Sequence, residues 1–591
     1  MTGDDPGSWR VWWTLNHDRF IDVAAHAPIA VSDSGHSVER SVARADAYER
    51  LIPIVTRVVE QEENEILLGR ALIALAKLGE NPRIANSREV YKQILPFVAN
   101  EKTRIAESAA VALGILGHDD AVMTLSKYAS APQGKTGNGI ADGARSDRVR
   151  AFALYGLGLV ARDAKREDVR RVAASRLCAI FTAEQGMAVD VKVACLQALS
   201  LVPLGPDAEA ALNDGNLEVP TASRDTEVEW VLRVLDSTSE ATWVRAQAAT
   251  TAARLCGNQP EGSKLRARIA DRLVETLMNG SHDGLPIRQS AALALGQVGD
   301  SDDDASDVEI RDALTAAMMS DSDQATRYFA MMALAQAASR PGGPAAHTER
   351  LAAADATRAL LLRRATQGSE TDRAWAAISI GVFEYRMRQA GQTTSPDSAV
   401  ALRSMLEDTH SPEVAGASCL ALGLAGVTGA KDELMAQLTS PDSLVRGFAA
   451  LSLGMLGVRE AAPALERVLD KADGAPDVYV PVSEGLAMLG APVTERLIKA
   501  LVGGGASLEA QLAACVAIGR TGGARAVRPL SDLVDDSTGT TWVRAVAVEA
   551  LGSIGDHGAT RWNARYAFDL NFLALPLTGT APTFDGVLDL E

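Results

Sequence analysis

A single phrase recurs along this chain and limits what it can fold into. A basic or polar residue is followed by an Ala-rich apolar run that ends in Leu-Gly or a similar pair. About thirteen copies begin near Arg70, Arg104, Arg150, Lys192, Arg245, Arg288, Arg327, Arg373, Glu413, Arg446, Tyr479, Ala510 and Arg544. The late copies are about 31 to 34 residues apart, whereas some early ones are farther apart. A period in the thirties to forties with variable insertions predicts a helical solenoid.

The copy around Arg446 shows why the unit is a pair of helices. Ser443 is a suitable N-cap for a helix over 444–456, and Gly457 is suited to the left-handed position that ends it. Because residues 447–458 carry no charge, this helix must be covered on nearly every side. The next segment, 461–471, has apolar residues on one face and charges on the other. Each unit is therefore a buried inner helix and a half-exposed outer helix, and stacking of the pairs buries both.

These phrases resemble the HEAT-repeat family, and more narrowly the short bacterial HEAT repeats also found in phycobilin-lyase-type proteins. The residues that carry the resemblance are 440–457 and 542–552. It covers roughly residues 40–560 and implies an all-α, HEAT-type superhelix of about thirteen hairpins that serves mainly as a binding surface. At about 8–10 Å per hairpin, the stack predicts an arc on the order of 100–130 Å with one concave face.

Three regions follow from this pattern: a Trp-rich cap segment over 1–40, the solenoid over 41–560 and an extended tail over 561–591. Trp9, Trp12 and Trp13 have helical spacing after Ser8, a suitable N-cap. The main expectation is an end cap packed on the first hairpin; the alternative is an aromatic docking patch for a partner. The candidate partner-binding residues are Trp9, Trp12, Trp13, Phe20 and Phe572.

The tail breaks the repeat. Apolar and polar residues alternate over 566–572, which is strand-like, and Pro and Gly then exclude a long helix. We expect an extended tail laid back on the last repeats. Both ends together are similar to bacterial HEAT-repeat proteins with a Trp-rich start and an aromatic, acidic tail. Insertions between the repeats are expected to be solvated connectors, with binding as the alternative. They span 130–147, 203–225, 300–309, 340–347, 389–397 and 470–477.

The net charge of −18 argues against a nucleic-acid partner, because such a partner needs a basic surface. No segment is long and apolar enough to suggest a membrane span, and residues 1–6 lack the features of a signal peptide. A cytoplasmic location is therefore expected as the sequence stands, with export if a native signal precedes it. The five cysteines lie in apolar helical runs and are expected to be small buried residues.

Motifs for catalysis and metal binding do not fit their known requirements. Residues 129–136 match a relaxed phosphate-binding loop, but they follow a helical run instead of a strand. The acidic run 300–309 lacks the Gly and Glu that an EF-hand requires, so we expect a solvated loop, with a nonspecific cation site as the alternative. None of the eight histidines pairs with another at helical spacing or precedes a Glu, as in the HEAT-fold iron hydroxylases. We expect no cofactor or metal.

The recurring Arg is expected to be structural. Asp323 and Asp442 each lie four residues before such an Arg and could pair with it. In the HEAT resemblance these residues form a ladder between neighbouring repeats. The sequence thus predicts a non-catalytic scaffold that binds a protein or peptide through its concave face and insertion loops. A cofactor handler resembling the bilin lyases, or an exported envelope component, are the alternatives.

Overall fold

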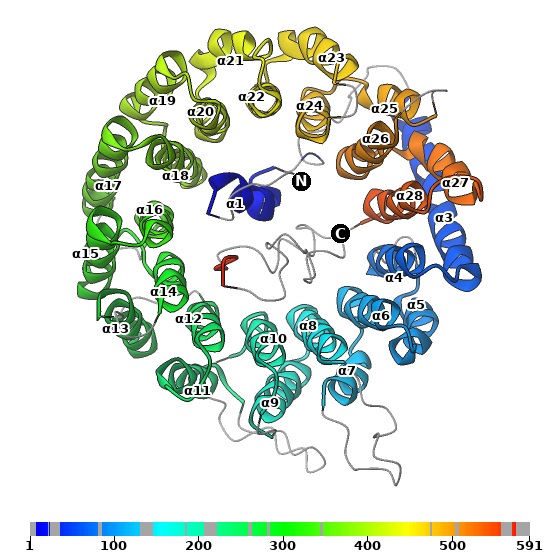
Figure 1. The fold of residues 1–591 in the computed structure, drawn as a ribbon, viewed down its shortest axis with the longest axis horizontal. Coiled ribbons are helices and arrows are strands. Elements are labelled where there is room, and N and C mark those ends of the chain that lie inside the picture. Colours follow the sequence, from blue (N-terminus) through cyan, green and yellow to red (C-terminus); the bar gives the residue numbers. More distant parts are fainter. Residues whose placement is uncertain are drawn as a thin grey trace.

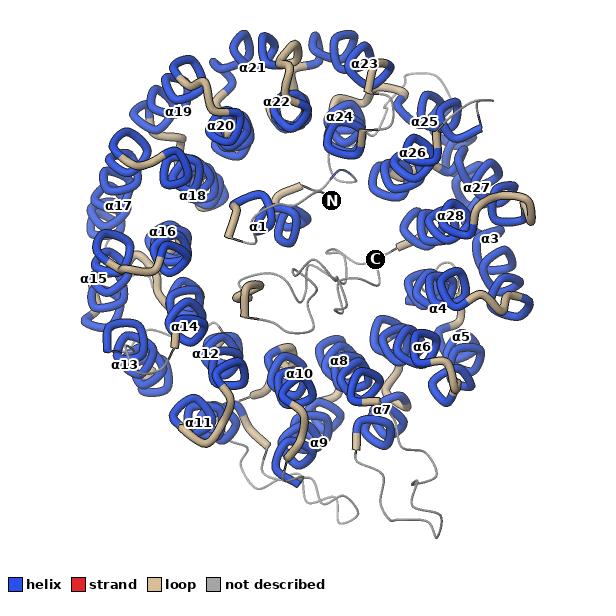
Figure 2. The backbone as a smooth tube through the Cα atoms, in the orientation of Figure 1, coloured by secondary structure: helices blue, strands red, loops and turns tan. Residues whose placement is uncertain are grey.

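The computed structural model describes residues 7–21, 23, 36–80, 85–130, 146–183, 186–205, 222–257, 263–279, 284–342, 347–472, 475–502, 507–556 and 570–574. Within these residues the protein is all-α, without a strand (Figure 2). Thirteen helix pairs stand in two concentric layers around a common centre (Figure 1). The predicted fold class, an all-α HEAT-type superhelix of about thirteen hairpins, is confirmed.

The inner layer contains the predicted Ala-rich phrases. Its helices are α4 (Glu65–Glu80), α6 (Thr103–Leu116), α8 (Asp147–Asp163), α10 (Val189–Ser200), α12 (Thr242–Cys256), α14 (Leu285–Val298), α16 (Gln324–Ser339), α18 (Glu370–Gln389), α20 (Pro412–Ala425), α22 (Ser443–Met455), α24 (Pro476–Met488), α26 (Leu508–Thr521) and α28 (Thr541–Ile554). Most residues of these helices are buried.

The outer layer is amphipathic and half-exposed. Its helices are α3 (His36–Gln61), α5 (Ser87–Ile94), α7 (Ala121–Ala129), α9 (Glu167–Ala183), α11 (Arg224–Asp236), α13 (Lys264–Asn279), α15 (Ala305–Ser320), α17 (His347–Gln367), α19 (Pro396–Asp408), α21 (Lys431–Gln437), α23 (Ala462–Asp470), α25 (Val493–Val502) and α27 (Val527–Asp535). Short 3-10 turns precede or follow some of them: η2 (Leu95–Ala99), η4 (Thr428–Ala430), η5 (Arg459–Ala461) and η6 (Ala524–Ala526).

The pair α22–α23 follows the predicted design with one correction. Gly457 has φ +68 and ends the inner helix in the left-handed conformation. The N-cap, however, is Asp442 and not Ser443, because the Asp442 carboxylate accepts a hydrogen bond from the Val445 N–H at 3.0 Å. In the outer helix, Leu465 and Leu469 are buried while the charged face is turned outward.

The recurring Arg joins the two helices of its own hairpin. Arg245 Nε donates to the carbonyl of Leu235 at 2.8 Å, and Arg544 Nε donates to that of Val534 at 3.0 Å. These carbonyls lie in the last turn of the preceding outer helix, where the backbone leaves acceptors unsatisfied. Equivalent bonds join Arg150 to Ala129, Arg288 to Leu277 and Arg373 to Ala365. Arg327 and Arg446 bond instead to the carbonyls of Asp321 and Ser440, which follow the end of the outer helix. The structural role is confirmed.

The predicted acidic partners of this Arg are wrong. Asp323 and Asp442 are N-caps: Asp323 accepts from the Thr326 N–H at 2.7 Å, as Asp442 does from Val445. An Asp at this position satisfies free amides at the helix start. The Arg, which is the fourth residue of the inner helix, reaches back towards the outer helix.

The two ends of the solenoid meet, so that α28 packs on α4 and the inner layer is a closed ring (Figure 1). The seam repeats the register of the internal contacts. A Cβ added to Gly552 of α28 would lie 2.6 Å from Ala74 Cα of α4, and one added to Gly381 of α18 would lie 2.8 Å from Ala421 Cα of α20. In both pairs the Gly is the twelfth residue of its helix and the neighbour is the tenth. The ring therefore closes without an axial step.

Three ion pairs cross the seam. Arg57 of α3 contacts both carboxylate oxygens of Asp535 of α27, at 2.7 and 2.8 Å. Arg544 contacts Glu62 at 3.1 Å, and Arg70 is hydrogen-bonded to Glu549. The expectation of an extended arc is thus wrong. The rotation from one hairpin to the next accumulates to a full circle over thirteen hairpins, and the first and last hairpins cover each other.

A candidate binding surface inside the ring

The Trp-rich N-terminal segment lies inside the ring and not at its end (Figure 1). Helix α1 (Trp9–Asn16) begins after Ser8, whose hydroxyl accepts from the Arg10 N–H at 3.2 Å, as the spacing predicted. It is followed by the turn η1 (His17–Arg19). Trp12 is only 1% exposed. The expected packing on the first hairpin is wrong, because α1 contacts α18, the eighth inner helix.

An aromatic surface on the inner layer receives this segment. The ring centroids of Trp9 and Phe448 lie 5.3 Å apart, and those of Trp12 and Trp375 lie 6.5 Å apart. The Trp375 indole N–H donates to the carbonyl of Gly7 at 3.1 Å. These are the distances of favourable aromatic pairs. Three residues, Trp375, Tyr385 and Phe448, contact the segment directly, and Tyr328 and Phe329 pack on Trp375. We call these five residues, which lie on α16, α18 and α22, the aromatic wall.

Phe20 closes the apolar contact at the end of the segment. Its ring packs edge-on against Tyr385 at 5.2 Å and stacks on Trp13 at 5.8 Å. Trp12 lies 6.1 Å from the same ring. Four aromatic residues separated by as much as 373 positions in the sequence thus form one cluster.

Charged groups hold the segment at both of its ends. Near its start, Arg10 pairs with Glu413 at 3.3 Å, and the Ser8 hydroxyl donates to the same carboxylate. At its other end, Arg520 of α26 contacts Asp18 at 2.8 Å. The segment therefore spans the distance between the ninth and twelfth inner helices and is held by partly buried ion pairs.

The two most buried tryptophans of the docked segment have indole N–H groups without an acceptor among the described residues. The indole nitrogens of Trp9 and Trp12 are buried without a hydrogen bond within the described part of the chain. A buried donor without an acceptor costs about 1–3 kcal/mol. Docking is therefore stabilised by apolar contact and by the charged ends, while these two donors oppose it.

The described part of the C-terminal tail lies against α14 and α16 of the inner layer, so the expected packing on the last repeats is wrong for these residues. Residues 570–574 form a turn, because the N–H of Phe572 bonds to the carbonyl of Leu570 at 3.0 Å. Residues 566–569 of the segment expected to be strand-like lie outside the described residues. Asn571 Nδ2 donates to Pro286 O, Gln289 Oε1 and Ser290 Oγ at 3.1 to 3.3 Å. The remainder of the tail lies outside the described residues.

One contact chain links the two terminal segments. Phe572 packs edge-on against Phe329 at 5.5 Å, and Phe329 packs edge-on against Trp375 at 6.2 Å. Trp375 in turn contacts Trp12. The structure therefore brings all five candidate residues, Trp9, Trp12, Trp13, Phe20 and Phe572, to the concave face, where they are buried. Whether they bind a partner stays a prediction.

The residues of the aromatic wall were missed by the sequence reasoning. They lie within the apolar inner phrases, where they look like ordinary core residues. One signal was available: aromatics make up only 4% of the chain, and four of the wall residues fall on two neighbouring inner helices, α16 and α18.

The acidic run that resembled a calcium loop is not a solvated loop, and that expectation is wrong. Asp300, Asp302 and Asp307 are packed so closely that one oxygen of each lies within 4.8 Å of the others. Arg266 Nη2 lies 2.6 Å from Asp307 and 2.8 Å from Asp300, so a guanidinium stands where a cation would bind. Burial, together with the charge of Asp300, raises the pKa of Asp307 to about 7, against the opposing effect of Arg266.

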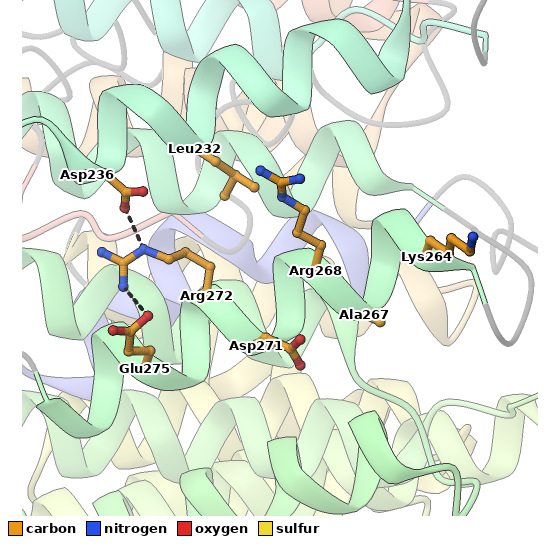
Figure 3. Close-up of a pocket in the computed structure, with 8 residues that line it drawn as sticks. All are labelled: Leu232, Asp236, Lys264, Ala267, Arg268, Asp271, Arg272 and Glu275. Carbon is orange, nitrogen blue, oxygen red and sulfur yellow. Dashed lines mark hydrogen bonds and ion pairs between the residues drawn. The ribbon is translucent and has the colours of Figure 1, made fainter.

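The outer surface has a groove between α11 and α13 with a volume of about 440 Å³ (Figure 3). Arg272 bridges it by pairing with Asp236 and, at 3.0 Å, with Glu275. The other residues that line the groove are basic and acidic side chains together with the apolar Leu232 and Ala267. Because its charges are largely paired within the chain, the groove shows no preference for one ligand charge.

Other predicted features can be placed in part. Four cysteines, Cys195, Cys256, Cys419 and Cys515, are buried as expected, while Cys178 is half-buried and hydrogen-bonds to Glu227. The phosphate-loop-like segment is preceded by α7, as expected, and residues 131–145 lie outside the described part of the chain. Among the described helices, none is both long and apolar enough to cross a bilayer.

The sequence of part of the ring decides its repeat type. Residues 399–478 match the family model for HEAT repeats. This HEAT match runs from α19 to the first residues of α24. None of the curated proteins compared with the chain matches it.

Several solved structures resemble the ring distantly. A complex of Kap95 with Nup1 has 13% identity over 90% of this chain and 77% of its own, with a TM-score of 0.39. Importin beta has 14% identity over 90% and 77%, with a TM-score of 0.36. Human deoxyhypusine hydroxylase has 15% identity over 57% and 96%, with a TM-score of 0.21. At these identities and TM-scores the solved structures say nothing about the function of the ring.

Proposed function

We propose that the protein is a non-catalytic HEAT scaffold that binds a protein partner through the aromatic wall on its concave face. The observation that carries the proposal is the burial of Trp9 and Trp12 against Phe448 and Trp375. A surface that accepts an aromatic helix from the same chain has the shape and chemistry to accept one from another chain. Tryptophan is also one of the residue types enriched at interface hot spots, which lie in well-packed pockets.

The docked segment indicates the kind of peptide that fits. It is a short helix with aromatic residues one turn apart, a basic residue that reaches Glu413 and an acidic one that reaches Arg520. A partner segment with this pattern would compete with residues 7–20 for the wall. The resident segment has the advantage of covalent linkage, which corresponds to an effective concentration in the millimolar range.

The test uses the full chain and a labelled peptide with the sequence of residues 7–20. In the variant Trp9→Ala/Trp12→Ala the resident segment loses its two main contacts. Fluorescence anisotropy should then show peptide binding at least about tenfold tighter than to the wild type, because the wall is no longer occupied in cis. The matched control, Met123→Ala/Val400→Ala, removes two exposed apolar side chains from outer helices and should not change binding.

A wall variant identifies the site of binding. Adding Phe448→Ala to the Trp9→Ala/Trp12→Ala chain should abolish the gain in peptide affinity. Proteins captured from a lysate by Trp9→Ala/Trp12→Ala but not by the triple variant would be candidate partners. Equal peptide affinity of the wild type and the Trp9→Ala/Trp12→Ala chain would contradict the proposal.

A further inference from the structure

The topology assigns each helix end to one of two faces of the ring. Every inner helix follows an antiparallel outer helix, so all inner helices begin, and all outer helices end, on the same face. Because the seam keeps the register of the internal contacts, this face has no axial step between α28 and α4. We call it the start rim. A nearly flat face of this kind can meet another flat surface over its whole circumference.

The exposed large apolar side chains gather on the start rim. Within the described residues there are eleven such side chains, and seven occupy the last two positions of an outer helix or the first two of an inner helix. Trp243, which is 40% exposed, and Trp542, which is 50% exposed, are the second residues of α12 and α28. The seven are Trp243, Met278, Leu285, Met319, Val502, Leu508 and Trp542.

These residues form two patches on opposite sides of the ring. The first, Trp243 to Met319, belongs to the fifth, sixth and seventh hairpins, and the second, Val502 to Trp542, belongs to the twelfth and thirteenth. The centres of the two patches are six and a half hairpins apart in a circle of thirteen, which is half a turn. Figure 1 shows α12 to α15 and α25 to α28 facing each other across the centre.

Glu509 and Asp536 are exposed on this rim, but three other carboxylates near the patches are paired with arginines. Asp236 pairs with Arg272 and Asp321 pairs with Arg288 beside the first patch. Asp535 pairs with Arg57 at 2.7 Å beside the second. Although the chain carries a net charge of −18, these acids would not strongly repel a like-charged surface. Much of the remaining rim consists of neutral side chains, such as Ser237, Thr238, Ser239, Thr538 and Thr540.

We propose that the start rim is the interface of a homodimer in which two rings stack face to face. A two-fold axis in the plane of the rim brings both patches of one copy onto both patches of the other, and this symmetry closes at two copies. Given the 150–250 Å² of a large aromatic side chain, the seven residues offer on the order of 600 Å² of apolar surface. With the neutral rim residues, this reaches the roughly 800 Å² per partner of a standard interface.

A lipid surface is the less favoured occupant. The rim has Trp residues suited to a bilayer interface, but the described residues around them provide no cluster of free basic groups. An acidic protein is repelled by anionic lipid unless such a cluster overcomes the repulsion.

Sedimentation velocity of the full chain tests the dimer. We expect a species of twice 62.2 kDa at concentrations of about 1–100 µM. Trp243→Ser and Trp542→Ser should each weaken dimerisation at least about tenfold, because both patches must engage together. The matched control is Val400→Ser, which changes the most exposed apolar side chain, at 66%, in the middle of an outer helix, and should leave the dimer unchanged.

Several results would overturn the proposal. One is a monomer throughout this range, and another is a dimer that neither Trp substitution weakens. Open-ended oligomers would show that the patches do not meet through a two-fold axis. Co-flotation of a monomer with neutral phosphatidylcholine vesicles, lost on Trp243→Ser, would assign the rim to a lipid surface instead. Circular dichroism of each variant should match the wild type, since the changed side chains are exposed.

Discussion

Gly552 on the last inner helix lies against Ala74 on the first, at a distance that leaves no room for a side chain on the glycine. The two residues are 478 positions apart, yet their contact has the same register as those between neighbours along the chain. Ring closure therefore depends on close approach of two backbones at a seam that no covalent hairpin crosses.

Substitution of this glycine should open the ring. Gly552→Leu forces α28 away from α4 and is expected to cost about 1–3 kcal/mol, the usual cost of overpacking. Small-angle scattering should show a larger radius of gyration, because no covalent connection holds the two ends of the ring together once α28 and α4 separate. The matched variant Gly381→Leu disrupts an internal contact of the same register and should destabilise without expansion, since α19 still joins α18 to α20. Equal radii for both variants would show that the seam is no weaker than an internal contact.

The seam ion pair Arg70–Glu549 is partly buried and should be measurable. Arg70→Glu places two carboxylates at the seam and should lower the free energy of unfolding by about 1–2 kcal/mol. Adding Glu549→Arg should restore most of this loss in a double-mutant cycle. The matched charge reversal Arg525→Glu, in the exposed pair Arg525–Glu495, should change the free energy of unfolding by less than about 0.5 kcal/mol. Failure of the second change to rescue the first would argue against a direct interaction.

The recurring Arg should protect the end of its own outer helix. Arg245→Ala removes the hydrogen bond to the Leu235 carbonyl, so this buried acceptor at the end of α11 loses its donor. Loss of a hydrogen bond from a charged donor costs about 1.5–3 kcal/mol. Hydrogen exchange should therefore accelerate in the last turn of α11 while α17 and α19 keep their protection. Arg268→Ala, an exposed change on the outer layer, serves as the control and should leave exchange in α11 nearly unchanged.

The buried carboxylate Asp307 should make stability depend on pH. Its pKa is raised to about 7 by burial and by Asp300, above the usual value of 3.8, so the folded protein holds a proton that the unfolded chain releases. Stability from this group is present at low pH and is lost as the pH rises from about 4 to about 7. Asp307→Asn cannot titrate. The melting temperature of the wild type minus that of Asp307→Asn should thus be lower at pH 8 than at pH 5, and a constant difference would contradict the assignment.

The repeat could be predicted from the sequence because each hairpin is a local structure. The inner phrase around Arg446 contains its own cap, its uncharged run and its terminal glycine within 16 residues, so the thirteen hairpins and their two layers follow from short-range patterns. Asp442 instead of Ser443 as the cap is a difference of one residue, since both types satisfy the same amides.

Closure and the aromatic wall could not be predicted, because both depend on the rotation from hairpin to hairpin accumulated over the whole chain. A small change in the rotation per hairpin would separate Gly552 from Ala74, and no local pattern records that rotation. The position of Trp12 on Trp375 follows from closure, which leaves the centre of the ring as the place where an apolar segment can be buried. Likewise, Asp307 looked solvated because Arg266, which buries it, lies 41 residues away.

The in-register seam also makes the starting point of the chain arbitrary with respect to the fold. Every inner helix has a neighbour on each side, so no repeat is left to fray as the outermost unit of an open stack would. A circularly permuted chain that joined α28 to α3 and was cut between two other hairpins would keep the same set of helix contacts. The arrangement also fixes the copy number, because duplication or loss of a single hairpin would leave a circle that no longer closes.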